Sequence, residues 1–102
     1  MKLRMLPPAL EDLEEAGQFY ENSQKELGQR FMTELIGEID SLRYRAGIHR
    51  VCLGYHRLLV HRFPFAVFYK IISEEVIVFR VLDCRCDPKW IQAKLGDPED
   101  RP

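Results

Sequence analysis

The chain has 102 residues, of which 46% are hydrophobic and 30% charged, and its formal net charge is −1. This length and composition are typical of one soluble globular domain. Every apolar run is far shorter than the roughly 20 residues of a membrane-spanning helix, and none near the N-terminus is typical of a secretory signal. We therefore expect a cytoplasmic protein with reduced cysteines and no membrane partner.

The charged side chains are unevenly distributed along the chain. Residues 1–42 carry four basic and nine acidic side chains, whereas residues 43–95 carry ten basic and four acidic ones. A positive C-terminal half indicates an anionic partner for that half. The alternative is that the acidic residues solvate helix faces and the basic ones balance them. Charge alone leaves both interpretations open.

The N-terminal half predicts one strand and two helices. Residues 2–6, KLRML, alternate weakly in polarity and then meet two prolines, which predicts a short strand that ends there. From Pro8 the apolar residues recur at three- and four-residue steps, which predicts a helix whose acidic N-terminal part suits the helix dipole. Its apolar stripe is Leu10, Leu13, Ala16, Phe19 and Tyr20. A second helix, joined by a short connection, has the stripe Leu27, Phe31, Leu35, Ile39 and Leu42.

The C-terminal half predicts three strands. After an irregular segment, YHRLLVHRF (55–63), FAVFYKII (65–72) and EVIVFRVLD (75–83) are rich in aromatic and β-branched residues, and short connections separate them. Such connections are typical of antiparallel neighbours. Residues 88–95 predict a helical turn, and residues 96–102 predict a polar, disordered tail.

Together these elements predict one α+β domain over residues 1–95, in the order β-α-α-β-β-β. A mostly antiparallel sheet is covered on one face by the helical hairpin, and its other face can remain open to water. Basic residues lie on or beside the strands, and arginine in particular matches phosphate geometry, so the sheet is a candidate phosphate-binding surface. The alternative is that they only solvate the sheet. They are Arg57, His61, Arg62, Lys70, Arg80 and Arg85.

The segment RVLDCRCDPKW, residues 80–90, holds the densest chemistry in the chain. Cys84 and Cys86 are too close together for the usual zinc site, and they do not form the Cys-x-x-Cys redox motif. No serine, histidine and aspartate fall in a recognisable nucleophile motif. We therefore expect neither a metal nor a cofactor, and we expect the cysteines to be reduced packing residues.

Four pieces of the chain resemble the RelE/ParE family of toxins from type II toxin–antitoxin systems, often described as plasmid stabilisation proteins. They are ALEDLEEAGQFYE, LGQRFMTELIGEI, FPFAVFYKI and VIVFRVLDCRCDPKW, and the resemblance covers roughly residues 3–92. It implies a RelE-like fold in a bacterial or archaeal protein. It also implies a cognate antitoxin, whose disordered segment folds onto the toxin and blocks its working surface. A homodimer and a toxin–antitoxin hetero-oligomer are both compatible with this resemblance.

The resemblance implies either of two activities. RelE-like members cleave mRNA on the ribosome without a metal, through attack of the 2′-hydroxyl on the adjacent phosphate. That activity assigns catalytic roles to Arg85, Asp83, Arg62 and Tyr69, with Tyr69 as proton donor. Phosphate binding then falls to Arg57, Lys70, Arg80 and Lys89.

The family's usual strand-ending pattern is Val-x-His-x-x-Arg-x-Pro. In this chain Asp83 stands at the histidine position, Arg85 is kept, and Cys86 beside it stands where a basic residue is often found. An ordinary aspartate is ionised at pH 7 and cannot act as the acid. ParE-like members instead bind DNA gyrase and need no catalytic residues. A sequence pI near 6.3 argues against ribosome binding, although the basic half remains. A third interpretation is a degenerate copy that only binds its partner.

Overall fold

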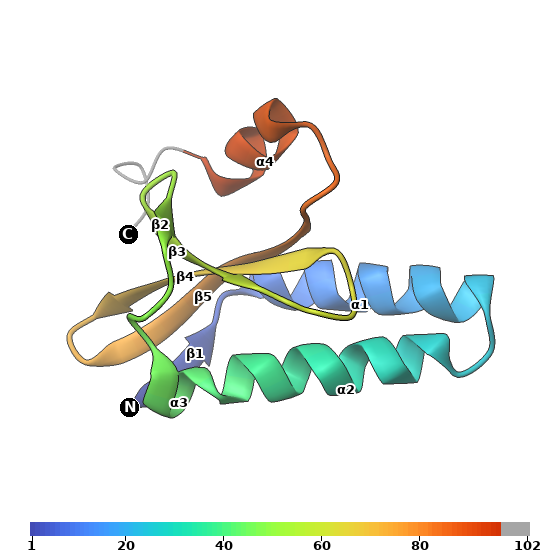
Figure 1. Ribbon diagram of the computed structural model, residues 1–102, viewed down its shortest axis with the longest axis horizontal. Coiled ribbons are helices and arrows are strands. Elements are labelled where there is room, and N and C mark those ends of the chain that lie inside the picture. The colour runs from blue at the N-terminus through green and yellow to red at the C-terminus, as the bar shows by residue number, and fades with distance from the viewer. Residues whose placement is uncertain (97–102) are drawn as a thin grey trace.

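The computed structural model describes residues 1–96, which form one five-stranded sheet and four helices (Figure 1). The sheet order is β1-β5-β4-β3-β2, with β1 parallel to β5 and every other pair antiparallel. This confirms the predicted α+β fold with a mostly antiparallel sheet. The elements are β1 Lys2–Met5, α1 Pro7–Ser23, α2 Leu27–Asp40, α3 Leu42–Arg45, β2 Val51–Cys52, β3 Tyr55–Leu59, β4 Phe65–Ile72, β5 Glu75–Asp83 and α4 Pro88–Leu95.

The two longest strands, β4 and β5, have the bounds that the sequence predicts, whereas the predicted 55–63 strand is shorter and gains a partner. β3 ends at Leu59, after which Pro64 lies in a tight connection to β4. The segment expected to be irregular contains β2, which pairs with the start of β3. Leu53 and Gly54 join β2 to β3 with φ angles of 57° and 85°. Positive φ at both central residues matches the twist of a two-residue hairpin.

In the helical hairpin of α1 and α2, the predicted stripe of α1 is confirmed in part, because Leu13, Ala16 and Tyr20 pack in the main core. α1 buries Ala9, Leu13 and Gly17, while Leu10 is 48% exposed and Phe19 is 61% exposed. Close contact between the two helices explains the difference, because a Cβ atom on Gly28 would lie 2.4 Å from the carbonyl oxygen of Gly17. Small residues therefore decide which side of α1 faces α2. The second stripe is confirmed, since Phe31, Leu35, Ile39 and Leu42 are all buried.

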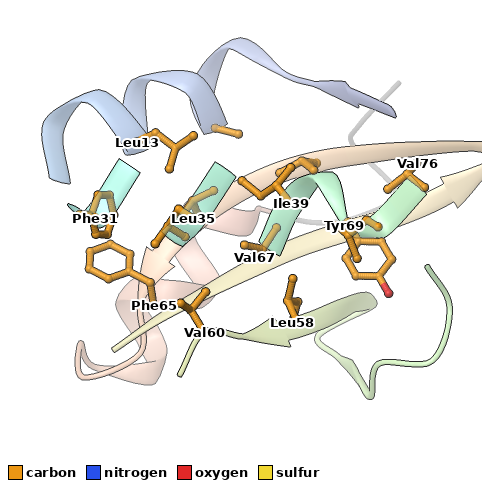
Figure 2. Close-up of a cluster of buried hydrophobic side chains, with 14 residues drawn as sticks. Leu13, Phe31, Leu35, Ile39, Leu58, Val60, Phe65, Val67, Tyr69 and Val76 are labelled. Carbon is orange, nitrogen blue, oxygen red and sulfur yellow. The ribbon is translucent and has the colours of Figure 1, made fainter. Parts of the chain in front are cut away.

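The main core lies between this hairpin and the sheet. Figure 2 shows Leu13, Phe31, Leu35 and Ile39 facing the strands, with Phe65 at one end of the cluster and Tyr69 at the other. The sheet's opposite face is not fully open, because α4 covers part of it (Figure 1). Leu95 of α4 is 1% exposed and packs in a second cluster there. Of the predicted tail, only Gly96 lies within the described residues.

Candidate functional site

The end of β5 carries an ion pair between two of the predicted site residues. The Arg85 guanidinium donates to both carboxylate oxygens of Asp83, at 2.8 Å to Oδ2 and 3.1 Å to Oδ1. The backbone N–H of Arg85 also donates to Oδ1, at 2.8 Å. These hydrogen bonds from Arg85 hold the pKa of the Asp83 carboxyl below its usual value, against the opposing effect of burial. Asp83 is therefore an ionised carboxylate that orients Arg85.

Tyr20 lies beside this ion pair, although its sequence position predicts only a core residue. Its ring packs against Phe63, with centroids 5.0 Å apart, and against Phe31 at 5.1 Å. Burial raises the pKa of the Tyr20 hydroxyl, while the charge of Arg85 lowers it and that of Asp83 raises it. The hydroxyl is thus within electrostatic reach of both charged groups. Nothing in the local sequence of α1 could predict this, because it depends on how the hairpin packs on β5.

Arg62 belongs to the same end of the molecule. It is exposed in the connection between β3 and β4, and that connection is hydrogen-bonded to the segment after β5, with Cys84 N–H donating to Pro64 C=O at 2.7 Å. Arg62 lines a hollow of about 580 Å³ together with Phe63 of the same connection and Arg30 of α2. The connection that carries Arg62 therefore adjoins the segment that carries Arg85, while Arg62 itself lines a hollow on the α2 side.

The structure does not bring Tyr69 to this site. Tyr69 pairs with Val78, whereas Asp83 pairs with Phe65 at the other end of β4, about 13 Å away at 3.3 Å per residue. The Tyr69 side chain is 0% exposed. Its hydroxyl accepts the N–H of Gly47 at 2.9 Å. Tyr69 is therefore a buried structural residue and is not placed to give a proton to a substrate at Arg85.

A histidine pair encloses the Tyr69 ring. The Tyr69 hydroxyl is hydrogen-bonded to Nδ1 of His49 at 2.5 Å, and the His56 ring stacks on Tyr69 with centroids 5.0 Å apart. Burial raises the pKa of Tyr69, and burial lowers the pKa of His49, as do the nearby charges of Arg45 and His56. Nε2 of His49 is buried and has no partner among the described residues. The hydrogen bonds of Tyr69 with Gly47 and His49 hold the 46–50 segment against the sheet.

Arg57 and Lys70 lie on the face of the sheet that α4 partly covers. Parity along β3 and β4 places them there, alternating with residues that pack under the hairpin. The Lys70 ammonium is 4.7 Å from the ring centroid of Tyr55, a cation–π contact. Lys89 is exposed on α4. These three residues keep charged groups at a surface, but they do not converge on Arg85 as one cluster.

Arg80 forms part of the scaffold. Its Nε and Nη2 donate to the two carboxylate oxygens of Asp12 at 2.8 and 2.7 Å, and its Nη1 donates to Lys94 C=O at 3.0 Å. Asp12 also accepts the backbone N–H of Val81 at 3.0 Å, on the stretch of β5 that β1 leaves uncovered. Because each of its three side-chain nitrogens already donates a hydrogen bond, Arg80 joins α1, β5 and α4 and is not a free phosphate ligand. Asp12 lies beyond the first turn of α1, so its role is this bridge and not the predicted dipole contact.

The cysteines are all free thiols, and their packing is less complete than predicted. Cys84 is exposed, and Cys52 and Cys86 are half-buried. Within residues 1–96, no group of three or more His, Cys, Asp or Glu side chains is placed to hold a metal ion. Over the same residues, no helix has the length and apolar character needed to cross a membrane.

The fold defines a class of small α+β domains in which a mostly antiparallel sheet carries a helical hairpin. A family described as the ParE toxin of the type II toxin–antitoxin system parDE matches residues 3–88. The chain therefore belongs to the ParE toxin family. A search of curated proteins finds no match to this chain.

A solved structure shares the fold. It is described as "Chromosomal ParDE TA system from P. aeruginosa", with a TM-score of 0.73 and 21% sequence identity over 79% of this chain and 92% of that chain. Family membership makes the protein the toxin of a type II toxin–antitoxin system, for which an antitoxin is the partner.

Proposed function

We propose that this toxin arrests growth by binding DNA gyrase, without cleaving RNA and without a cofactor. The observation that carries the proposal is that Tyr69, the expected proton donor, lies away from Asp83 and Arg85, which are paired with each other. Arg85 is held by an ionised Asp83, and Tyr69 is buried at the far end of β4. Metal-independent RNA cleavage needs a proton acceptor, a proton donor and a free cation around one phosphate. A binding toxin needs only an accessible surface.

The surface that we assign to gyrase is the end of β5 and its surroundings. Arg85 has a side chain that is 66% exposed, and Asp83 holds its guanidinium in one orientation. Arg62 and Lys89 are also exposed, on segments that flank the end of β5. A fixed, exposed arginine suits a planar carboxylate or phosphate on the target. In this proposal Asp83 is a positioning residue for Arg85 and not an acid.

The test compares Arg85→Ala with Arg43→Ala. Arg43 is the matched control, because it is also exposed and also donates to a nearby carboxylate, that of Asp40 at 2.7 Å. The wild-type toxin should block supercoiling of relaxed plasmid by purified gyrase. Arg85→Ala should need about tenfold more protein for the same block, a change of about 1.4 kcal/mol in binding, while Arg43→Ala should behave as wild type.

Growth and RNA are followed after induced expression of the same variants. The proposal expects lost viability together with relaxed plasmid, and mRNA whose 5′ ends are unchanged. New mRNA ends at fixed codon positions, with gyrase unaffected in the purified assay, would contradict it. Absence of any growth defect would contradict growth arrest through either target.

One observation favours ribosome-dependent RNA cleavage as a second candidate, and that is the position of Tyr20. Its hydroxyl interacts electrostatically with both Asp83 and Arg85, so it is the phenol that could serve as a proton donor at this end. Tyr20→Phe keeps the ring contacts with Phe31 and Phe63 and removes only the hydroxyl. If Tyr20→Phe abolishes new mRNA ends, this candidate replaces gyrase binding. If the variant inhibits gyrase as wild type does, the first proposal stands.

A further inference from the structure

Two free thiols flank the exposed arginine of the strand-end ion pair. Cys84 and Cys86 stand on either side of Arg85 in the chain, and neither forms a disulfide. The backbone N–H of Cys86 donates to Asp83 C=O at 3.3 Å, which closes a β-turn over residues 83–86. Both thiols therefore belong to the turn that presents Arg85 at the surface.

The spacing of these two cysteines allows a disulfide between them. Cα atoms two residues apart are at most about 7 Å apart in an extended chain and closer in a turn, and disulfides join Cα atoms about 4.4–6.8 Å apart. The third thiol, Cys52, pairs with Tyr55, whereas Cys84 is hydrogen-bonded to the connection that follows the other end of β3. The two ends of β3 are about 13 Å apart at 3.3 Å per residue, too far for a disulfide. Cys52 is therefore excluded as a partner.

We propose that Cys84 and Cys86 are an oxidisable pair whose disulfide closes across Arg85 and separates this arginine from Asp83. Reduced thiols leave the arginine oriented by the carboxylate, and the disulfide removes that orientation. The pair makes the exposed arginine respond to the thiol redox state around the toxin. The effect on the toxin's target rests on the proposed function, whereas the disulfide and its effect on Asp83 do not.

The turn transmits closure of the disulfide ring to Arg85 because both of its flanks are held. Cys84 N–H donates at 2.7 Å to a carbonyl oxygen of the connection between β3 and β4. On the other flank, Asp87 caps the N-terminus of α4 by accepting a backbone N–H at 2.8 Å. A disulfide imposes its own dihedral angle of about ±85–100°, so the residues left to adjust are Arg85 and Cys86. The Arg85 N–H, which is 2.8 Å from Asp83 Oδ1 in the reduced protein, then turns away.

The oxidant is oxidised glutathione. The Cys86 thiolate attacks one sulfur of oxidised glutathione, forms a mixed disulfide and releases one glutathione thiolate. The Cys84 thiolate then attacks the Cys86 sulfur, which forms the protein disulfide and releases the second glutathione. The two glutathione thiolates take up the two protons that the cysteines lose. The protein thus gives up two electrons, and one oxidised glutathione becomes two reduced ones.

The surroundings of the two thiols set the order of these steps. The Arg85 guanidinium is within electrostatic reach of Cys86, and a cation there attracts the negatively charged oxidised glutathione. Cys84 is exposed, but the protein around it still removes part of its water, and this desolvation raises the pKa of its thiol against the opposing charge of Arg57. Cys86 is therefore the attacking thiol, and Cys84 is the resolving one.

Disulfide formation is measured on the purified chain in glutathione buffers that range from reducing to oxidising, followed by alkylation and intact mass spectrometry. The wild type should lose two hydrogen atoms, gain no glutathione and keep one alkylated cysteine, which peptide mapping should identify as Cys52. Cys84→Ser and Cys86→Ser should each retain one glutathione as a mixed disulfide. The matched control Cys52→Ser should form the internal disulfide as the wild type does. A wild type that keeps its mixed disulfides, or that forms only disulfides between two chains, would overturn the proposal.

The effect on the ion pair is measured by NMR titration of the Asp83 carboxyl. In the reduced protein Arg85 holds the pKa of this carboxyl below its usual value, and the disulfide should return the pKa toward that value. The double variant Cys84→Ser with Cys86→Ser, checked for a native circular dichroism spectrum, should keep the lowered pKa in the same oxidising buffer. The same Asp83 pKa in both redox states of the wild type would contradict redox control of Arg85.

Gyrase inhibition is then compared after the glutathione has been removed. The oxidised wild type should need about tenfold more protein than the reduced wild type for the same block of supercoiling. The double variant Cys84→Ser with Cys86→Ser should inhibit equally from both buffers. Equal inhibition by the two wild-type forms would contradict redox control at the target. If the reduced wild type does not inhibit gyrase at all, the proposed function fails, while the mass and titration results still test the redox pair.

Discussion

Similar polar groups have different roles in two regions of the sheet. In the enclosed region, Asp12 binds Arg80 beside the middle of β5, and Tyr69 binds the 46–50 segment from β4. In the open region, Asp83 binds Arg85 at the strand end, where the arginine side chain is 66% exposed. Enclosed partners have lost their water, so each depends on the other, whereas exposed partners can exchange a partner for water or for a ligand. The enclosed groups therefore stabilise the fold, and the open ones remain available for binding.

The largest expected difference between the two regions is seen when their carboxylates, Asp12 and Asp83, are removed one at a time. Asp12→Ala leaves the Arg80 guanidinium and the Val81 N–H without their acceptor, and we expect a loss of about 3 kcal/mol in the free energy of unfolding. Asp83→Ala should shift it far less, because its partner is exposed. Urea denaturation of the two variants measures both values. Equal losses would mean that the two regions do not differ as described.

A smaller effect should follow from removing one hydroxyl in each region. Tyr69→Phe removes the acceptor for Gly47 N–H and the partner of His49 Nδ1, so it should cost roughly 2 kcal/mol. Tyr20→Phe at the open end should cost less than about 0.5 kcal/mol. The control is the hydrogen exchange of the Gly47 amide, which should accelerate only in Tyr69→Phe. A larger loss in Tyr20→Phe would reverse the assignment of the two tyrosines.

The smallest expected effect is a pH dependence of stability, in which the enclosed and the open region lose stability over different pH ranges. The pKa of His49 is lowered by burial, then by Arg45 and His56, and raised slightly by Glu38, so the folded state binds a proton less readily than the unfolded one. Neutral His49 contributes its full stabilisation of the folded state above the ordinary histidine pKa of 6.5. That stabilisation is lost as pH falls through the lower pKa of His49 in the folded state.

Asp83, whose pKa is also lowered, keeps its contribution until pH falls below its ordinary value of 3.8. Denaturation midpoints between pH 7.5 and 3 should therefore decline in two steps. His49→Gln should remove the upper step, and Asp83→Asn the lower one. An upper step that persists in His49→Gln would assign that step to another group and contradict this prediction.

Much of the fold could be predicted because its signals are local. Long runs of aromatic and β-branched residues with short connections fix β4 and β5 to the residue. β2 could not be predicted, because it has only two residues and depends on Leu53 adopting a positive φ that leucine rarely takes. The exposure of Leu10 and Phe19 was also missed, since the packing of α1 is decided by two glycines on facing helices.

The site was predictable only where its partners are neighbours in sequence. Asp83 and Arg85 are two residues apart, so their proximity follows from the chain itself. Arg80 finds its partner 68 residues away in Asp12, and Tyr69 finds its partners in Gly47 and His49, 22 and 20 residues away. No periodicity or composition encodes such pairings. The resemblance to a toxin family supplied the fold and the antitoxin partner, but it could not say which basic residues are already occupied.

The parallel pairing of β1 with β5 has a consequence for the order of synthesis. Lys2–Met5 hydrogen-bonds to the strand that begins at Glu75, so β1 leaves the ribosome well before the strand with which it pairs. The helical hairpin can form early from local contacts, but it has no completed sheet to cover until then. A cell that translates this message therefore holds an incompletely folded domain until β5 has been synthesised, and the ion pair of Asp83 and Arg85 forms only after that strand has left the ribosome.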